Sequence, residues 1–90
     1  MSTLLISYDL RKPGRNYEDL YELLRSFNSW SRPLQSVWFV KTTNTVETVG
    51  KTILNVVDSN DVVLVLDVHT QSWWSSNIPT DAAEWMKKAI

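Results

Sequence analysis

The order of strand-like and helix-like segments predicts one α+β domain with a ferredoxin-like βαββαβ fold. Two observations carry this prediction. Short apolar runs alternate with two segments whose apolar residues recur at helical spacing, as a split βαβ arrangement requires. The composition is 43% hydrophobic and 21% charged, which is typical of a folded protein rather than a disordered one. Because 90 residues leave room for one core, residues 1–90 are expected to form one domain. We expect an antiparallel sheet with two helices on one face and a short C-terminal helix.

The first third of the chain predicts a strand followed by a helix. Residues 4–10 are mostly apolar and read as a buried strand, which the segment Arg11-Lys12-Pro13-Gly14-Arg15 then breaks. Asn16 is a suitable N-cap for a helix that should run to about Phe27. Its apolar stripe consists of Tyr17, Leu20, Tyr21, Leu24 and Phe27.

The middle of the chain predicts a second strand and a second helix. Residues 34–43 are strand-like, and the other arm of the hairpin is either Ser29–Arg32 or a bend within this strand. Asn44 and Glu47 resemble a capping box for the helix that follows. Gly50 lowers the helix propensity and would allow close packing on the sheet. The apolar stripe of this helix consists of Val46, Val49, Ile53, Val56 and Val57.

The last third predicts a turn, a strand and a short helix. Asp58-Ser59-Asn60-Asp61 is a polar turn. Residues 62–68 are apolar almost throughout, which predicts a central strand or one covered on both faces. Pro79 and Thr80 begin the final helix. Ala82, Trp85, Met86 and Ala89 share one face of it.

Several classes of protein are disfavoured by composition. The chain has no cysteine, so it can form neither a disulfide nor a thiolate metal site. The N-terminal apolar run is too short for a signal peptide, and the sequence has no run of membrane-spanning length. A cytoplasmic protein without a membrane partner is expected. The formal net charge of −1 argues against tight nonspecific DNA binding, although a local basic patch could exist.

Asp9 is the first candidate for a functional residue, because a rigid strand presents it just before a loop. With a second carboxylate from elsewhere it could bind Mg²⁺, and the alternative is an ion pair with Arg11 or Arg15. Arg11, Lys12 and Arg15 precede a helix and could bind a phosphate there. The alternative is a solvated loop, since Glu18 and Asp19 already place negative charge at the helix start.

The remaining polar candidates are expected to be structural or superficial. Asp58 and Asp61 suit a turn, and Asp67 is expected at the rim of its strand. His69, the only histidine, is expected on the surface, although a base–nucleophile pair with Ser7 or Ser36 can be imagined. The aromatic set could stack bases, or could fill the core and an interface. This set consists of Trp30, Trp38, Phe39, Trp73, Trp74 and Trp85.

Three short motifs resemble the CRISPR-associated Cas-two family, and most closely its stand-alone relatives, the "SinR family" of small proteins. They are Tyr8-Asp9 closing a strand, the stretch Ser36-Val37-Trp38-Phe39-Val40-Lys41-Thr42, and Asn60-Asp61 before an apolar strand. The resemblance implies a ferredoxin-like homodimer. In nuclease members, the aspartate at the position of Asp9 faces its symmetry mate and shares Mg²⁺ or Mn²⁺ with it. Other members are structural subunits of a spacer-integration complex, and toxin relatives are ribonucleases.

The chain departs from that family in two places. The family's Ser-Val-Phe-Glu becomes Ser36-Val37-Trp38-Phe39, which loses the glutamate, and residues 73–90 differ from the family's strand-swapping tail. Three hypotheses follow. The first is a homodimeric metal-dependent nuclease, or a subunit that binds RNA or DNA. The second is a non-catalytic scaffold that binds a protein partner through a tryptophan-rich surface. The third is a small-molecule regulatory domain.

Overall fold

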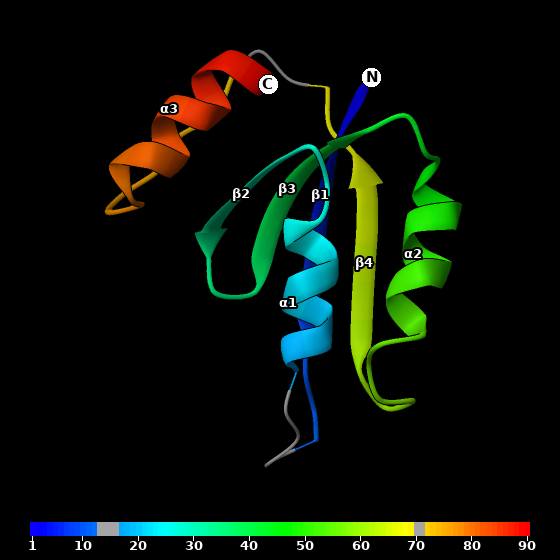
Figure 1. The fold of residues 1–90 in the computed structure, drawn as a ribbon. Coiled ribbons are helices and arrows are strands. Elements are labelled where there is room, and N and C mark those ends of the chain that lie inside the picture. Colours follow the sequence, from blue (N-terminus) through cyan, green and yellow to red (C-terminus); the bar gives the residue numbers. More distant parts are fainter. Residues whose placement is uncertain (13–16, 70–71) are drawn as a thin grey trace.

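A computed structural model describes residues 1–12, 17–69 and 72–90. Its strands are β1 (Ser2–Asp9), β2 (Ser29–Leu34), β3 (Val37–Thr42) and β4 (Val62–Asp67), and its helices are α1 (Glu18–Arg25), α2 (Val46–Leu54) and α3 (Thr80–Ala89). The four strands form one antiparallel sheet in the order β2-β3-β1-β4 (Figure 1). The predicted ferredoxin-like α+β arrangement is therefore confirmed.

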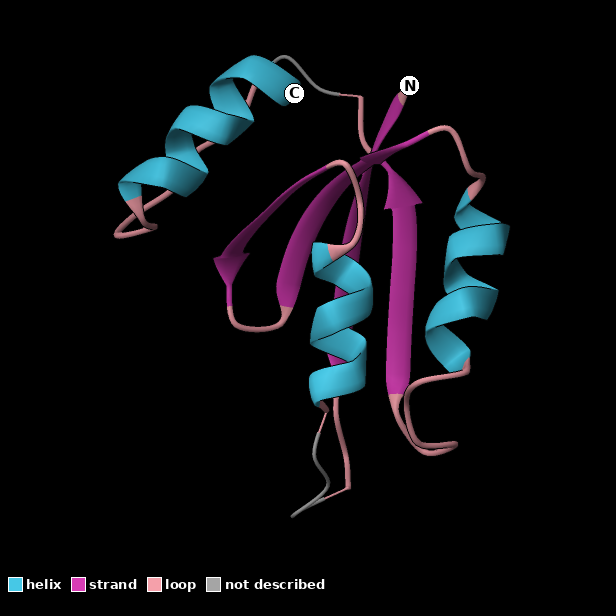
Figure 2. Ribbon diagram, in the orientation of Figure 1, coloured by secondary structure: helices cyan, strands magenta, loops and turns pink. Residues whose placement is uncertain are grey.

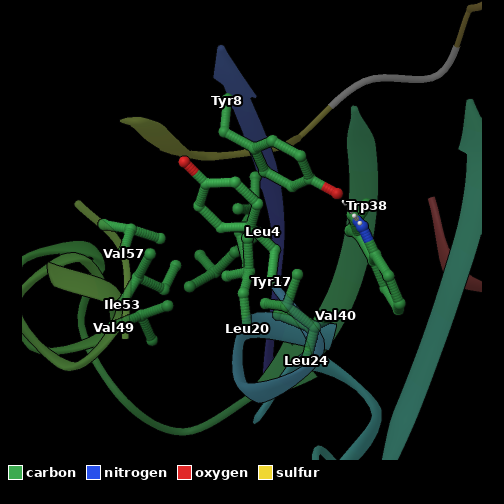
Figure 3. Packing of buried hydrophobic residues seen from close by; sticks show 11 residues of the cluster. Leu4, Tyr8, Tyr17, Leu20, Leu24, Trp38, Val40, Val49, Ile53 and Val57 are labelled. Atoms are coloured by element: carbon green, nitrogen blue, oxygen red, sulfur yellow. Dashed lines mark hydrogen bonds between the residues drawn. The ribbon is translucent and has the colours of Figure 1, made fainter. Parts of the chain in front are cut away.

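One face of the sheet holds the core, together with α1 and α2 (Figure 3). Side chains alternate across a strand, so Leu4, Ile6 and Tyr8 of β1 all point to this face. Trp38 and Val40 of β3 join them, and the two helices contribute the apolar stripes that the sequence predicted. The innermost helical residues are Leu20, Leu24, Val49 and Ile53.

The β2–β3 hairpin resolves the alternative that the sequence left open. Ser29–Leu34 is a separate arm, and its register with β3 shifts between Ser31 and Leu34. Pro33 lies within this irregular part of an edge strand, where its missing N–H breaks no regular ladder. The hairpin therefore accommodates a proline that a central strand would exclude.

The helix boundaries differ in detail from the predictions. Helix α1 ends at Arg25 rather than near Phe27. Thr45, not Asn44, caps α2, because the Thr45 hydroxyl accepts the Thr48 backbone N–H at 3.1 Å. Asn16, the predicted cap of α1, lies outside the described residues.

The second face of the sheet is only half covered. Helix α3 packs there, because the rings of Trp85 and Phe39 lie 6.1 Å apart and Trp85 Nε1 donates to the Ser29 hydroxyl at 2.8 Å. The Thr3 hydroxyl also donates to the Ala89 carbonyl at 2.9 Å, close to the C-terminal end of α3. These contacts join α3 to β2, β3 and the start of β1. In Figure 2, α3 lies at the β2 edge of the sheet, on the side away from α2.

Strand β4 is an edge strand, so the prediction of a central or doubly covered strand was wrong. Val63 and Val65 pack against the core, whereas Val62, Leu64 and Leu66 on the second face are 47%, 54% and 39% exposed. Continuous apolarity was a misleading signal here, because one of the two apolar faces is uncovered.

Candidate functional site

Asp9 is the last residue of β1, at the end of the sheet where β4 begins. It pairs with Val62, and its side chain is 65% exposed. By strand alternation it belongs to the second face, with the exposed residues of β4 and away from the helices. The carboxylate therefore lies at the rim of an uncovered apolar surface.

Asp9 forms the ion pair that the sequence offered as an alternative. Its Oδ2 accepts the Arg11 Nε–H at 3.1 Å, and Arg11 Nη2 lies 3.1 Å from the same oxygen. Both side chains are more than half exposed. Ion pairs of this kind contribute about 0–1 kcal/mol, so little free energy opposes releasing the carboxylate to another ligand.

The basic loop after β1 is fastened to the turn before β4. Asp61 Oδ1 accepts the Arg11 backbone N–H at 2.7 Å and the Tyr17 hydroxyl at 3.0 Å. The Lys12 ammonium lies 3.6 Å from a carboxylate oxygen of Asp58. Arg11 and Lys12 thus follow Asp9 on a supported segment, in which Arg11 contacts Asp9 and Lys12 contacts Asp58. Arg15 lies outside the described residues.

Asp58 and Asp61 are structural, as their turn motif suggested. Asp61 Oδ2 accepts the Asp58 backbone N–H at 2.8 Å, and an Asp58 carboxylate oxygen accepts the Asn60 backbone N–H at 3.2 Å. The contacts of Asp61 with Arg11 and Tyr17 cross 50 and 44 residues of sequence. The turn motif did not indicate this second role of Asp61, whose side chain holds the segment after Asp9 in place.

Within the described ranges, three or more histidine or carboxylate side chains do not gather at any point that could hold a metal ion. Among the described residues, the Asp9 end of the sheet therefore offers fewer than three such ligands, and Arg11 lies against the Asp9 carboxylate. His69 is exposed and follows the opposite end of β4, so the sheet does not bring it to Asp9. A divalent ion at Asp9 would need further oxygen ligands from a second chain and from water.

A second group of residues near Asp9 was missed by the sequence analysis. An open hollow of about 260 Å³ is lined by Tyr8, Asp9, Leu10, Tyr21, Arg32, Gln35 and Ser36. The Arg32 guanidinium carbon lies 4.7 Å from the Tyr21 ring centroid and 5.0 Å from that of Trp38. Its Nε and Nη2 donate to the Gln35 carbonyl at 3.0 and 2.7 Å. The guanidinium is thus fixed in place, and only the hairpin register, unknown from the sequence, brings it there.

Tyr8 joins that group to the core. Its hydroxyl donates to the Gln35 carbonyl and accepts the Trp38 Nε1–H, both at 2.9 Å. Burial raises the pKa of the Tyr8 hydroxyl above its usual value, while the Trp38 hydrogen bond and the Arg32 charge oppose that rise. Tyr8 is therefore a neutral hydrogen-bonding residue at neutral pH.

The tryptophans do not form one surface. Trp38 is 1% exposed and belongs to the core, and Trp85 packs on Phe39. Trp30 is partly exposed against Trp38, with ring centroids 5.3 Å apart, and Trp74 is 86% exposed. Core packing accounts for Trp38, and α3 docking accounts for Trp85.

A helix long and apolar enough to cross a membrane does not occur among the residues placed by the structure. A scan against protein-family models found no match to this chain, and searches of curated proteins and of solved structures found no match either.

Proposed function

We propose that the protein is a homodimer of the Cas-two type that binds and hydrolyses nucleic acid, with the two copies of Asp9 sharing Mg²⁺ or Mn²⁺. The observation that carries the proposal is the exposed Asp9 carboxylate at the rim of an uncovered apolar sheet face. The resemblance of Tyr8-Asp9 and Ser36–Thr42 to that family supports the same assignment.

The uncovered half of the second face supports a dimer. Val62, Leu64 and Leu66 of β4 expose apolar side chains there. On the neighbouring strand β1, Leu5 pairs with Leu66 and Ser7 pairs with Leu64. Apolar surface of this kind is stabilised when another surface removes it from water. Two copies packed through this face about a two-fold axis at its Asp9 end would bring their carboxylates together.

A pair of Asp9 residues suits a hard divalent cation better than one does. Mg²⁺ binds one or two protein carboxylates and keeps several waters, so two exposed carboxylates meet its requirement. A bound ion would supply Lewis-acid stabilisation of charge on a phosphodiester. Arg11, which contacts Asp9, would hold a phosphate beside it, together with Lys12, the next residue in the chain. Arg15 is the third cation that the sequence predicted for this role.

The local cations matter because the chain as a whole is slightly acidic. Without a general basic surface, affinity for nucleic acid must come from the residues that flank Asp9. Replacing Arg11 with glutamine should therefore weaken binding at the site while leaving the apolar dimer surface intact.

The test compares the wild-type protein with Asp9→Asn, using Asp67→Asn as the matched control. Asp67 is also an exposed carboxylate, but it lies at the opposite end of the same sheet. Labelled single-stranded RNA and double-stranded DNA are incubated with Mg²⁺ or Mn²⁺, and light scattering after size exclusion measures the mass of each variant. We expect cleavage by the wild type and by Asp67→Asn, with loss of cleavage in a dimeric Asp9→Asn. Equal cleavage by all three proteins, or a monomeric wild type, would contradict the proposal.

A further inference from the structure

A pocket of about 320 Å³ lies between strand β2 and the first half of helix α3. Trp30 and Arg32 line this Trp30 pocket from β2, and Asp81 and Trp85 line it from α3. Figure 1 shows α3 beside β2 at this edge of the sheet. Pockets that bind small ligands typically measure roughly 300–1,000 Å³, so the volume suits a single ring system.

The ring of Trp30 offers a flat surface in this pocket. It rests against the Trp38 ring, with centroids 5.3 Å apart, and Trp30 is still 38% exposed. Trp38 belongs to the core, so it supports Trp30 rigidly from below. An indole that is backed on one side and open on the other can stack a planar ligand.

The Arg32 guanidinium is held beside Trp30 by the same core tryptophan. Its central carbon lies 5.0 Å from the Trp38 ring centroid, and Nε and Nη2 donate to the Gln35 carbonyl. A guanidinium has five N–H groups, of which these two bonds use two. Arg32 can therefore donate to a ligand while it keeps its place on Gln35.

Asp81 adds an acceptor on the α3 side of the pocket. Its Oδ1 accepts the Ala82 backbone N–H at 2.9 Å, and Trp85 anchors the helix through its bond to the Ser29 hydroxyl. The hydrogen bonds of Asp81 and of Arg32 are to the backbone, so the two opposite charges line one pocket without being paired to each other. A ligand that bridges them needs donors on one edge and acceptors on another.

Guanine has the groups that this lining requires. Its N1–H and N2–H₂ donors lie side by side and match the two oxygens of a carboxylate, which only accepts. Its O6 and N7 are adjacent acceptors that a guanidinium binds in bidentate fashion. In adenine, the amino group has ring acceptors beside it, and these would repel the second carboxylate oxygen. The pocket should therefore prefer guanine.

We propose that the Trp30 pocket binds a guanine base, which stacks on Trp30, donates to Asp81 and accepts from Arg32. A free guanine nucleotide and a single-stranded nucleic acid both present this base unpaired, whereas a duplex hides its Watson–Crick edge. The inference goes beyond the proposed nuclease, because it requires neither Asp9 nor a metal ion, and it holds or fails independently of that activity.

The experiment follows the indole N–H signals of the five tryptophans by ¹H–¹⁵N NMR. EDTA is present, so no divalent ion takes part. The probes are GMP, AMP, and two single-stranded RNA heptamers, one all adenine and one with a central guanine. L-Phenylalanine is the comparison ligand, because it is a zwitterion that also carries a flat ring.

Two variants test the assigned contacts. Asp81→Asn keeps the acceptor for the Ala82 N–H but no longer offers two acceptors to guanine. Its matched control is Glu84→Gln, an exposed position on the same helix outside the pocket lining. Trp30→Leu removes the stacking ring and identifies the Trp30 signal.

We expect GMP and the guanine heptamer to shift the Trp30 signal and to bind at least about fivefold more tightly than their adenine counterparts. Asp81→Asn should lose this preference, and Glu84→Gln should keep it. Trp30→Leu, followed through the Trp85 signal, should bind guanine at least about fivefold more weakly. Equal affinity for GMP and the guanine heptamer would identify a free nucleotide as the ligand, and a tighter heptamer would identify a single strand.

The proposal is overturned if neither guanine probe shifts the Trp30 signal, or if wild type binds guanine and adenine alike. It also fails if a folded Asp81→Asn keeps the guanine preference, or if a folded Trp30→Leu binds like wild type. Binding of L-phenylalanine as tight as that of GMP would assign the pocket to a zwitterion instead.

Discussion

Replacing Tyr8 with phenylalanine should destabilise the fold through Trp38, a residue 30 positions away. The Tyr8 hydroxyl is the acceptor for the Trp38 Nε1–H, and Trp38 is almost fully buried. Phenylalanine keeps the ring but leaves that indole N–H without its partner. The Gln35 carbonyl, which also loses a donor, keeps both hydrogen bonds from Arg32.

The expected loss is therefore that of one buried donor left unsatisfied, about 1–3 kcal/mol of unfolding free energy. For a domain of this size, each kcal/mol lowers the melting temperature by roughly 4–8 °C. The loss is measured by urea unfolding monitored by circular dichroism, and an unchanged m-value shows that the shift of the midpoint reports stability.

A double-mutant cycle with Trp38→Phe tests the stated cause. Once the indole N–H is absent, Tyr8→Phe removes only the hydrogen bond to Gln35, and its cost should fall to about 0.5–1 kcal/mol. An equal cost of Tyr8→Phe in the two backgrounds would refute the reasoning, because the loss would then come from elsewhere in the Tyr8 environment.

Two further predictions concern the same end of the sheet. Because burial raises the pKa of the Tyr8 hydroxyl, the folded state binds this proton more tightly than the unfolded chain. The resulting stability is complete below about pH 10 and is lost as pH rises from there through the folded pKa, so urea midpoints between pH 9 and 11 should fall more steeply for wild type than for Tyr8→Phe. Asp61→Ala removes the acceptor of the Arg11 and Asp58 backbone N–H groups and of the Tyr17 hydroxyl, and should cost about 1–3 kcal/mol in thermal unfolding. The exposed Asp67→Ala should change stability by less than about 0.5 kcal/mol, and a similar cost for the two variants would argue against the fastening role of Asp61.

The sequence predicted the order of elements well, because strand and helix periods are local signals. The stripes that include Leu20 and Leu24, and Val49 and Ile53, face the core as expected. The place of β4 in the sheet could not be read in this way. Its run of valine and leucine reports two apolar faces, but it does not report whether the chain covers both of them.

The candidate site was predictable only for residues adjacent in sequence. Asp9 and Arg11 lie two positions apart, and their ion pair was anticipated. The contact of Asp61 with Arg11 depends on the pairing of β1 with β4. The place of Arg32 depends on the register of the β2–β3 hairpin. Sequence patterns contain side-chain period but little information on register, so these residues could be found only in the structure.

The central position of β1 has a consequence for how the chain is made. As the first strand, β1 leaves the ribosome long before either of its neighbours in the sheet, β3 and β4. At about 5–20 residues per second, the start of β4 follows the end of β1 by roughly 3–10 s. Throughout that interval Leu4, Leu5 and Ile6 have an unpaired edge in a nascent polypeptide. Until β4 has been made, that edge of β1 is therefore open to pairing with another chain.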